Sequence, residues 1–170
     1  MLFRSLSQIS CSHAELDAKY LDKVSTLDSA MITLYEVISG PAGETRNWEL
    51  FSYLFKSNAK LIPSGKNKEG LTGLRFMSPR EYIESSGKWL EENGFFEKEI
   101  HREVQQFGPM AHVFSTYEAR RAESDSTPFM RGINSIQLLW DEKRWWVVNI
   151  YWTNETEEYP LSERYLRPSR

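Results

Sequence analysis

The stretch RWWVVNIYW, residues 144–152, constrains the fold more than any other part of the chain. A strand with one side in water alternates apolar and polar residues. Here both alternating sets are rich in apolar and aromatic side chains: Trp145, Val147, Asn149 and Tyr151 on one face, and Trp146, Val148, Ile150 and Trp152 on the other. Both faces of this strand must therefore be held away from water, which demands a layer on each side.

The N-terminal half is typical of helices interrupted by short extended pieces. Apolar residues recur at helical spacing from 13 to 38, with a break expected near Ser25. Asn47 stands as an N-cap before a short helix, WELFSYLF. AKLIP is expected to form a short strand that ends at Pro63, and LTGLRFM a second extended piece. Ser78 opens a Ser-Pro-Arg-Glu capping box, which predicts another helix that ends at an Asn-Gly pair.

The second half alternates and predicts a sheet. Its pattern predicts four strands at 96–107, 110–121, 129–140 and 145–153. Helices followed by a meander of strands indicate an α+β fold and not a βαβ fold. A strongly curved antiparallel sheet can wrap its concave side around the helices, and an apolar convex side then needs a second subunit. We therefore expect a homodimer that forms through the convex sheet face.

Composition excludes several classes of protein. A length of 170 residues corresponds to about one domain, and its net charge of −3, with basic residues scattered among acids, argues against a nucleic-acid partner. The single cysteine, Cys11, excludes an internal disulfide and a cysteine metal cage. No apolar run approaches the ~20 residues of a membrane span, so a soluble cytoplasmic protein without a membrane partner is expected.

The last hairpin, RGINSIQLLWDEKRWWVVNIYWTNE, resembles the closing V-W-R-D-G-K-W-x-I-V hairpin of the NTF2-like superfamily, which includes ketosteroid isomerase and SnoaL-like cyclases. AMITLYEVISG, followed by an aromatic short helix, resembles the opening of that family. The resemblance covers residues 23–155, which leaves 1–22 as an N-terminal arm and 156–170 as a tail. It implies a cone in which a strongly curved antiparallel sheet wraps around three helices.

The resemblance also implies which residues line the cone. It places Trp152 in the cavity, and alternation then directs Trp146, Val148 and Ile150 inward. Pairing Trp140 with Trp145, and Phe107 with Met110, extends this inward face to the other strands. The predicted pocket residues are Tyr35, Arg102, Ser115, Tyr117, Arg131, Ser135, Gln137 and Trp152. The outward residues expected at the dimer interface are Ile136, Leu138, Trp140, Trp145, Val147 and Tyr151.

The chemistry of the isomerase is not complete in this sequence. The resemblance implies a tyrosine at Tyr35, but its base position falls on Pro63 and its acid position on Gln137. Proline cannot take a proton, and no inward carboxylate is found among the predicted strands, so no catalytic residue is assigned and the sequence favours a non-enzyme. His101 and His112 lie ~13 Å apart in the predicted register, too far to share a metal, and no metal or cofactor is expected.

The predicted function is the binding of a small apolar or weakly acidic ligand in the cone pocket. Arg102 and Arg131 either pair with carboxylates at the rim of the cone or bind an acidic group of the ligand, and both interpretations stay open. The alternatives are a SnoaL-, dehydratase- or isomerase-like enzyme acting on a small hydrophobic substrate, and a non-catalytic dimeric scaffold. A carboxylate or histidine next to Tyr35 would favour the enzyme.

Overall fold

The structure of the protein is a computed structural model that describes residues 14–167. Cys11 and the rest of residues 1–13, most of the predicted arm, lie outside the described residues. The helical elements are a first helix that includes residues 14–20, the 3-10 turn η1 (Leu21–Val24), α2 (Leu27–Glu36), α3 (Trp48–Leu54), α4 (Pro79–Tyr82), the π-helical turn η2 (Ile83–Gly87), α5 (Lys88–Asn93) and the 3-10 turn η3 (Glu163–Tyr165). The strands are β1 (Phe55–Lys66), β2 (Thr72–Leu74), β3 (Phe96–Phe107), β4 (Met110–Arg120), β5 (Met130–Trp140) and β6 (Trp145–Asn154).

The structure confirms three predicted helix starts, and each of them carries its own cap. Thr26 accepts a hydrogen bond from the backbone of Ser29 and starts α2 just after the expected break at Ser25. Asn47 caps α3 by accepting from Leu50 N. Ser78 and Glu81 form the reciprocal capping box of α4. These local signals need no tertiary information, which is why they could be located in the sequence.

The sheet is open, with the strand order β2-β1-β6-β5-β4-β3. The four long strands form the antiparallel meander that was predicted, and the hairpin pairs Phe107 with Met110 and Trp140 with Trp145 are confirmed. However, β1 pairs with β6 in parallel, so the sheet is mixed and not purely antiparallel. The strand also continues through Pro63, which pairs with Trp152, although the sequence predicted that it would end there.

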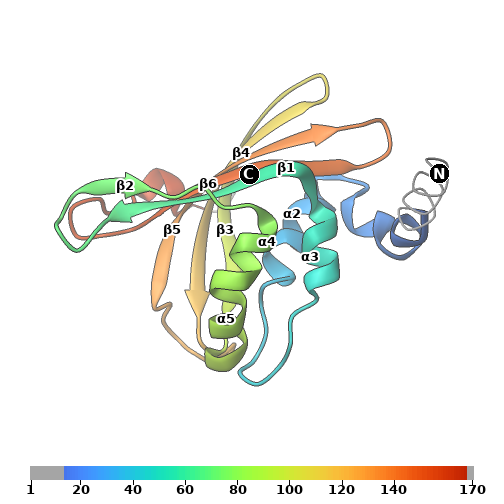
Figure 1. Ribbon diagram of the computed structural model, residues 1–170. Helices are drawn as coiled ribbons and strands as arrows, with labels where there is room; N and C mark the ends of the chain where they lie inside the picture. The colour runs from blue at the N-terminus through green and yellow to red at the C-terminus, as the bar shows by residue number, and fades with distance from the viewer. Residues whose placement is uncertain (1–13, 168–170) are drawn as a thin grey trace.

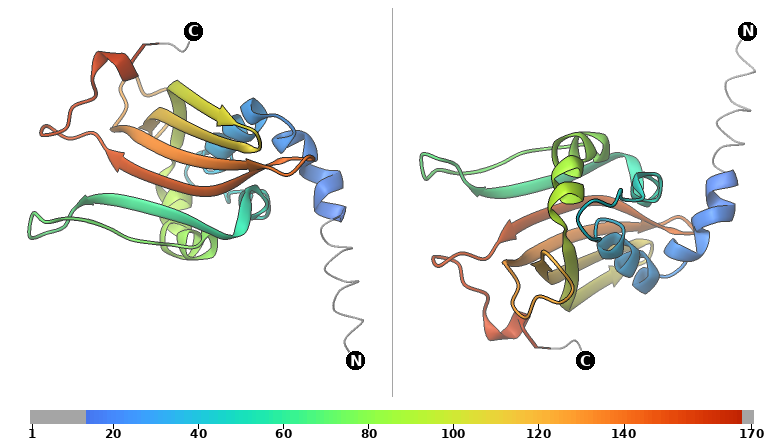
Figure 2. Two further views of the ribbon diagram at one scale, coloured as in Figure 1. Left: turned by 90° about the horizontal axis from the view of Figure 1, so that it is seen from above. Right: turned by 90° about the horizontal axis from the view of Figure 1, so that it is seen from below.

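The sheet is bent, and α2, α3, α4 and α5 lie together in its hollow (Figure 1). The β1–β2 hairpin extends beyond the helices, and the views from above and below show the sheet as one layer and the helices as the other (Figure 2). The main core lies between these layers, and it includes Met31 and Leu34 of α2, Phe51 of α3 and Val113 of β4. This is the α+β cone that the sequence predicted.

Two β-bulges decide which side chains enter the hollow. On β6, Val147 pairs with Leu138 while Asn149 pairs with Gln137, so Val148 is an extra residue. On β3, Glu99 pairs with Tyr117 while His101 pairs with Thr116, so Ile100 is extra. Because successive side chains alternate between faces, one inserted residue reverses the facing of everything beyond it. The sequence prediction assumed unbroken alternation and is wrong past each bulge.

The bulge at Val148 corrects the predicted dimer residues. Ile150 and Trp152 face the hollow as predicted, but on the other side of the bulge Trp145 and Val147 face it too. Their partners on β5 follow, so four residues expected on the convex face are in the core: Ile136, Leu138, Trp145 and Val147, with exposed fractions of 0%, 2%, 7% and 1%. Trp140 packs against the same core, and only Tyr151, at 45% exposed, remains on the outer face.

The convex face is partly covered by the chain itself. After β6 the segment turns back toward the first two long strands (Figure 2), where Arg164 forms two hydrogen bonds with Glu103 of β3, 2.7 and 2.8 Å long. The ring of Tyr165 packs on Phe114 of β4 with centroids 5.5 Å apart. The predicted tail is irregular as expected, apart from η3, but it is docked. Within residues 14–167, no helix combines the length and apolarity needed to cross a bilayer.

At the other end of the sheet a buried arginine joins the first helix, α3 and the β5–β6 turn. The Arg144 guanidinium lies between the rings of Tyr53 and Trp146, 3.6 and 3.7 Å from their centroids. Its Nη2 donates to Tyr53 O at 2.6 Å, and the Tyr53 hydroxyl donates to Asp17 of the first helix at 2.6 Å. Arg144 is only 1% exposed, so this stack is part of the core although its centre is charged.

Candidate functional site

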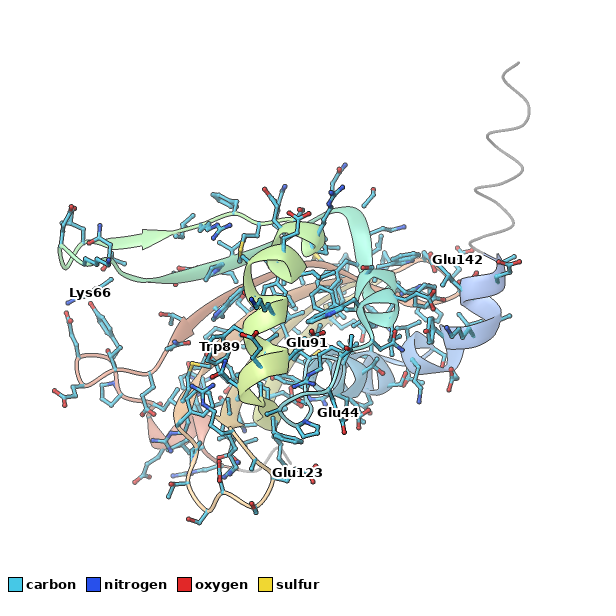
Figure 3. The ribbon with its side chains drawn as sticks, turned by 60° about the horizontal axis from the view of Figure 1, so that its bottom comes forward. Glu44, Lys66, Trp89, Glu91, Glu123 and Glu142 are labelled. Atoms are coloured by element: carbon cyan, nitrogen blue, oxygen red, sulfur yellow. The ribbon has the colours of Figure 1, made fainter. Side chains whose placement is uncertain are left out.

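A cavity of about 220 Å³ opens between the hollow of the sheet and the helices. Its wall is mostly apolar, with aliphatic side chains from α2, β1, α5, β5 and β6 and aromatic rings from every layer. The lining residues are Leu34, Tyr35, Ile38, Phe51, Leu61, Tyr82, Ser86, Trp89, Leu90, Phe95, Glu97, Tyr117, Met130, Asn134, Ile150 and Trp152. Figure 3 labels Trp89 and Glu91 on α5; Trp89 belongs to the wall, whereas Glu91 accepts a hydrogen bond from Trp48 Nε1 at 2.8 Å.

Three polar side chains of the wall, Tyr35, Glu97 and Asn134, meet at one end. Asn134 Nδ2 donates to the Tyr35 hydroxyl at 3.0 Å and to Glu97 Oε1 at 3.3 Å. Behind them, the Tyr35 hydroxyl and Ser115 Oγ lie 2.7 Å apart, and Ser115 Oγ donates to Glu99 Oε2. The bulge at Ile100 creates this cluster, since it turns Glu97 and Glu99 toward the hollow with Tyr117 and Ala119.

The carboxyl group of Glu97 is strongly perturbed. Burial raises its pKa from 4.5 to about 7, and the hydrogen bond from Asn134 offsets only part of that effect. The same carboxyl contributes to raising the pKa of the Tyr35 hydroxyl, for which burial is the larger cause. The pKa values of the Tyr82 and Tyr117 hydroxyls are likewise raised, first by burial and then by Glu97. Glu97 therefore exchanges protons near neutral pH beside three neutral phenols.

Glu99, the second acidic side chain that faces the hollow, is connected to the surface through Arg102. Arg102 Nε donates to Glu99 Oε1 at 2.6 Å, and Arg102 Nη1 donates to Asp28 at the start of α2 at 2.7 Å. A hydrogen-bonded path thus runs from Tyr35 at the cavity, through Ser115 and Glu99, to an ion pair at the edge of the cone. Arg102 is part of this support and does not line the cavity.

The structure brings together only part of the predicted pocket. Tyr35, Tyr117 and Trp152 line the cavity, and Ser115 lies one layer behind Tyr35. The other four predicted residues do not line it: Arg102, Arg131, Ser135 and Gln137. Arg131 pairs with Glu155 at 2.8 Å, Ser135 with His112 at 2.9 Å, and Gln137 accepts from Asn149 at 2.8 Å. The register shift at Val148 explains why the three residues on β5 face outward.

The residues that sequence reasoning missed are Glu97, Asn134, Tyr82 and the α5 side chains. Glu97 and Asn134 were assigned to the wrong face because both bulges were overlooked. The only signal in the sequence was the pair Glu97 and Glu99, two acids at the spacing of one strand face directly after Phe95 and Phe96. The conclusion that the strands hold no inward carboxylate is therefore wrong. Within residues 14–167, no group of three or more His, Cys, Asp or Glu side chains is placed to hold a metal ion.

Glycine at position 132 makes room for this site. A Cβ atom there would lie 2.4 Å from Thr153 O and 2.6 Å from the Tyr117 hydroxyl oxygen. The Tyr117 ring can cross β5 only because that position has no side chain, and its hydroxyl then donates to Asn154 Oδ1 at 2.6 Å. This pair fixes Tyr117 in the cavity wall.

Comparison with known proteins shows the fold. No family model matches the sequence, and no curated protein matches it. Among solved structures, the chain is similar to an NTF2-like protein of unknown function from Silicibacter pomeroyi, with 17% identity, coverage of 76% of this chain and 92% of that chain, and a TM-score of 0.53. It is also similar to a candidate dehydratase of the NTF2-like family from Streptomyces avermitilis, with 12% identity, coverage of 79% and 97%, and a TM-score of 0.55.

A third similar structure is a candidate calcium/calmodulin-dependent protein kinase II association domain from Xanthomonas campestris, with 14% identity, coverage of 77% and 86%, and a TM-score of 0.56. These proteins share an architecture while their descriptions differ. The chain has the NTF2-like cone fold, and the resemblance found in the sequence is confirmed at that level. Because one fold carries many functions, the function must be argued from the cavity itself.

Proposed function

We propose that this domain binds a small, largely apolar molecule in the cone cavity and holds the polar group of that molecule at the end where Glu97, Asn134 and Tyr35 meet. The observation that carries the proposal is an apolar cavity of about 220 Å³ in which three polar side chains meet at one end. That arrangement is typical of small-molecule sites, in which apolar walls supply affinity and few polar groups supply orientation. Acidic ligands are left out of the proposal because Arg102 and Arg131 are paired with carboxylates away from the lining.

The proposal is tested by filling the cavity. Ser86 lines it, so Ser86→Phe should occupy the space, whereas Ser85→Phe changes an exposed neighbour on the same turn. Benzyl alcohol serves as the probe, and NMR follows the indole N–H signal of Trp152 in the wall. We expect saturable shifts in the wild type and in Ser85→Phe, and none in Ser86→Phe. A wild type that does not respond, or a Ser86→Phe variant that responds equally, would refute a binding function for this cavity.

A second candidate is an enzyme of the dehydratase or isomerase kind, and one observation favours it. A carboxyl with a pKa of about 7 can both take and return a proton near neutral pH, as general acid–base catalysis requires. In this role Glu97 removes a proton from a carbon of the substrate, while Asn134 holds the Glu97 carboxylate in place. The likeness to the candidate dehydratase from Streptomyces avermitilis extends to the fold alone.

Proton transfer can be measured without knowing the natural substrate. A ketone with acidic C–H bonds, such as 2-indanone, is incubated with the protein in deuterated buffer, and NMR follows the loss of the C–H signal. Enzymatic chemistry predicts faster exchange with the wild type than with Glu97→Gln at equal concentration. Equal rates for the two proteins would exclude Glu97 as the base for this carbon acid and leave ligand binding as the proposed function.

A further inference from the structure

The ionisable side chains that line the cavity are of one sign. Glu97 is the one carboxyl in the lining, and no lysine, arginine or histidine of residues 14–167 lines the cavity. The Arg121 guanidinium lies 4.4 Å from the ring centroid of Trp89, but Arg121 is exposed and is also in contact with the ring of Phe129. The Arg102 cation is paired with Glu99 and Asp28. A ligand inside the cavity therefore meets a carboxyl group and no partner cation from the wall.

The hydrogen bonds at the polar end have a fixed direction. Glu99 Oε1 accepts from Arg102 Nε, and the single proton of the Ser115 hydroxyl goes to Glu99 Oε2. Ser115 Oγ must then accept the proton of the Tyr35 hydroxyl. Both hydrogens of Asn134 Nδ2 are also engaged, one by Tyr35 and the other by Glu97. What this end offers a ligand is a lone pair of the Tyr35 oxygen and the Glu97 carboxylate, which are acceptors.

The remaining wall is aromatic. Seven of the sixteen lining residues carry an aromatic ring. Tyr82 is stacked on Phe51 with centroids 5.4 Å apart, and Trp152 meets the Tyr82 ring edge-on at 6.5 Å. The face of an aromatic ring is negative and attracts a cation, and the attraction grows when the site is shielded from water. The Tyr82 hydroxyl can turn to donate or accept, so it does not alter this balance.

We propose that the ligand of this cavity is a small organic amine, bound as its ammonium ion with the N–H groups directed at Glu97 and the Tyr35 oxygen. An ammonium brings only donors and a positive charge, and these match a wall of acceptors and ring faces. A carboxylate ligand would meet Glu97 with like charge and find no donor at the polar end. A cavity of about 220 Å³ holds about seven waters at ~30 Å³ each, which suits one substituted ring or a short branched chain.

This inference rests on the proposed function and narrows its ligand class. The test compares three probes of nearly equal shape, which are benzylamine, benzyl alcohol and benzoate, by NMR titration at pH 8. We expect benzylamine to bind about tenfold more tightly than benzyl alcohol, because its hydrogen bonds are charge-assisted, and benzoate to bind more weakly than both. Benzyl alcohol or benzoate binding as tightly as the amine would overturn the inference while leaving the proposed function standing. If no probe binds, the proposed function fails and the inference with it.

A variant identifies the group responsible. Glu97→Gln keeps the acceptor for Asn134 but removes the charge, so it should abolish the tenfold preference for benzylamine while benzyl alcohol still binds. Glu123→Gln, which alters an exposed loop between β4 and β5, is the matched control and should keep the preference. A preference that survives in Glu97→Gln would overturn the assignment of Glu97. The probe series on the wild type does not depend on the folding of any variant.

Discussion

Replacing Glu97 by glutamine should change the pH dependence of stability in a calculable way. The folded-state pKa of Glu97 is about 7 and the ordinary value is 4.5. Below pH 4.5 the carboxyl is protonated in both states and costs nothing. Between pH 4.5 and 7 the unfolded chain ionises first, so the folded state loses relative stability, and above pH 7 the loss is complete. At ~1.4 kcal/mol per pKa unit the full loss is about 3 kcal/mol, and about 2 kcal/mol after allowance for contact with water in the cavity.

The measurement is urea unfolding of the wild type and Glu97→Gln, followed by tryptophan fluorescence from pH 4.5 to 8.5. Relative to the wild type, the free energy of unfolding of the variant should rise by about 2 kcal/mol between pH 4.5 and 7 and should not change further above pH 7. Glu81→Gln is the control: hydrogen bonds from Ser78 hold the pKa of the Glu81 carboxyl below its usual value, so its contribution changes only below pH 4.5 and the difference from the wild type should be constant across this range. A stability difference between Glu97→Gln and the wild type that is constant across this range would refute the buried, proton-holding carboxyl on which the site depends.

Three further predictions concern the frame around the site. Arg144→Met should lower the free energy of unfolding by about 2–3 kcal/mol in a urea titration, because it removes a buried cation between two rings and its hydrogen bond to Tyr53 O. The control Lys143→Met changes the exposed neighbouring residue and should lower the free energy of unfolding by less than about 1 kcal/mol. Gly132→Ala should reduce the thermal midpoint sharply by pushing Tyr117 and Thr153 O apart, and Tyr117→Phe should recover little of that loss because the clash with the backbone oxygen remains. The homodimer stays a prediction, for which light scattering should give twice the 20.0 kDa chain mass. Val148→Asp, a change on the outer face, should give a monomer. Trp145→Asp should instead unfold the chain, because Trp145 lies in the core. A single-chain mass for the wild type would refute the dimer.

Local signals made the outline of this fold predictable. The caps at Asn47 and Ser78 and the alternation after Phe95 specify where elements start and end, because they depend on neighbours in sequence. The two hairpin pairings also followed from short loops. The parallel pairing of β1 with β6 did not, since it joins segments far apart in the chain and leaves no periodic trace in either of them.

The candidate site was predictable only where alternation is unbroken. Tyr117 and Ser115 were assigned to the inward face of β4 correctly because β4 carries no inserted residue between them and the turn, although only Tyr117 lines the cavity. Glu97 and Asn134 were missed because Ile100 and Val148 each shift the phase, and neither residue differs in kind from an ordinary strand residue. A bulge depends on how two strands pair, so the sequence of one strand alone does not reveal it.

The unpaired residue on β3 determines which side chains face the hollow at this end of the cavity. If Ile100 paired regularly with Tyr117, residues 96–99 would move by one position along β4, so that Glu97 and Glu99 would face solvent while Phe96 and Lys98 turned inward. Removal of Ile100 would instead erase the bulge and leave Glu99 opposite Tyr117, with both acids still in the hollow. Relatives of the same shape could therefore present different interiors, according to whether this position is paired or left out of the ladder.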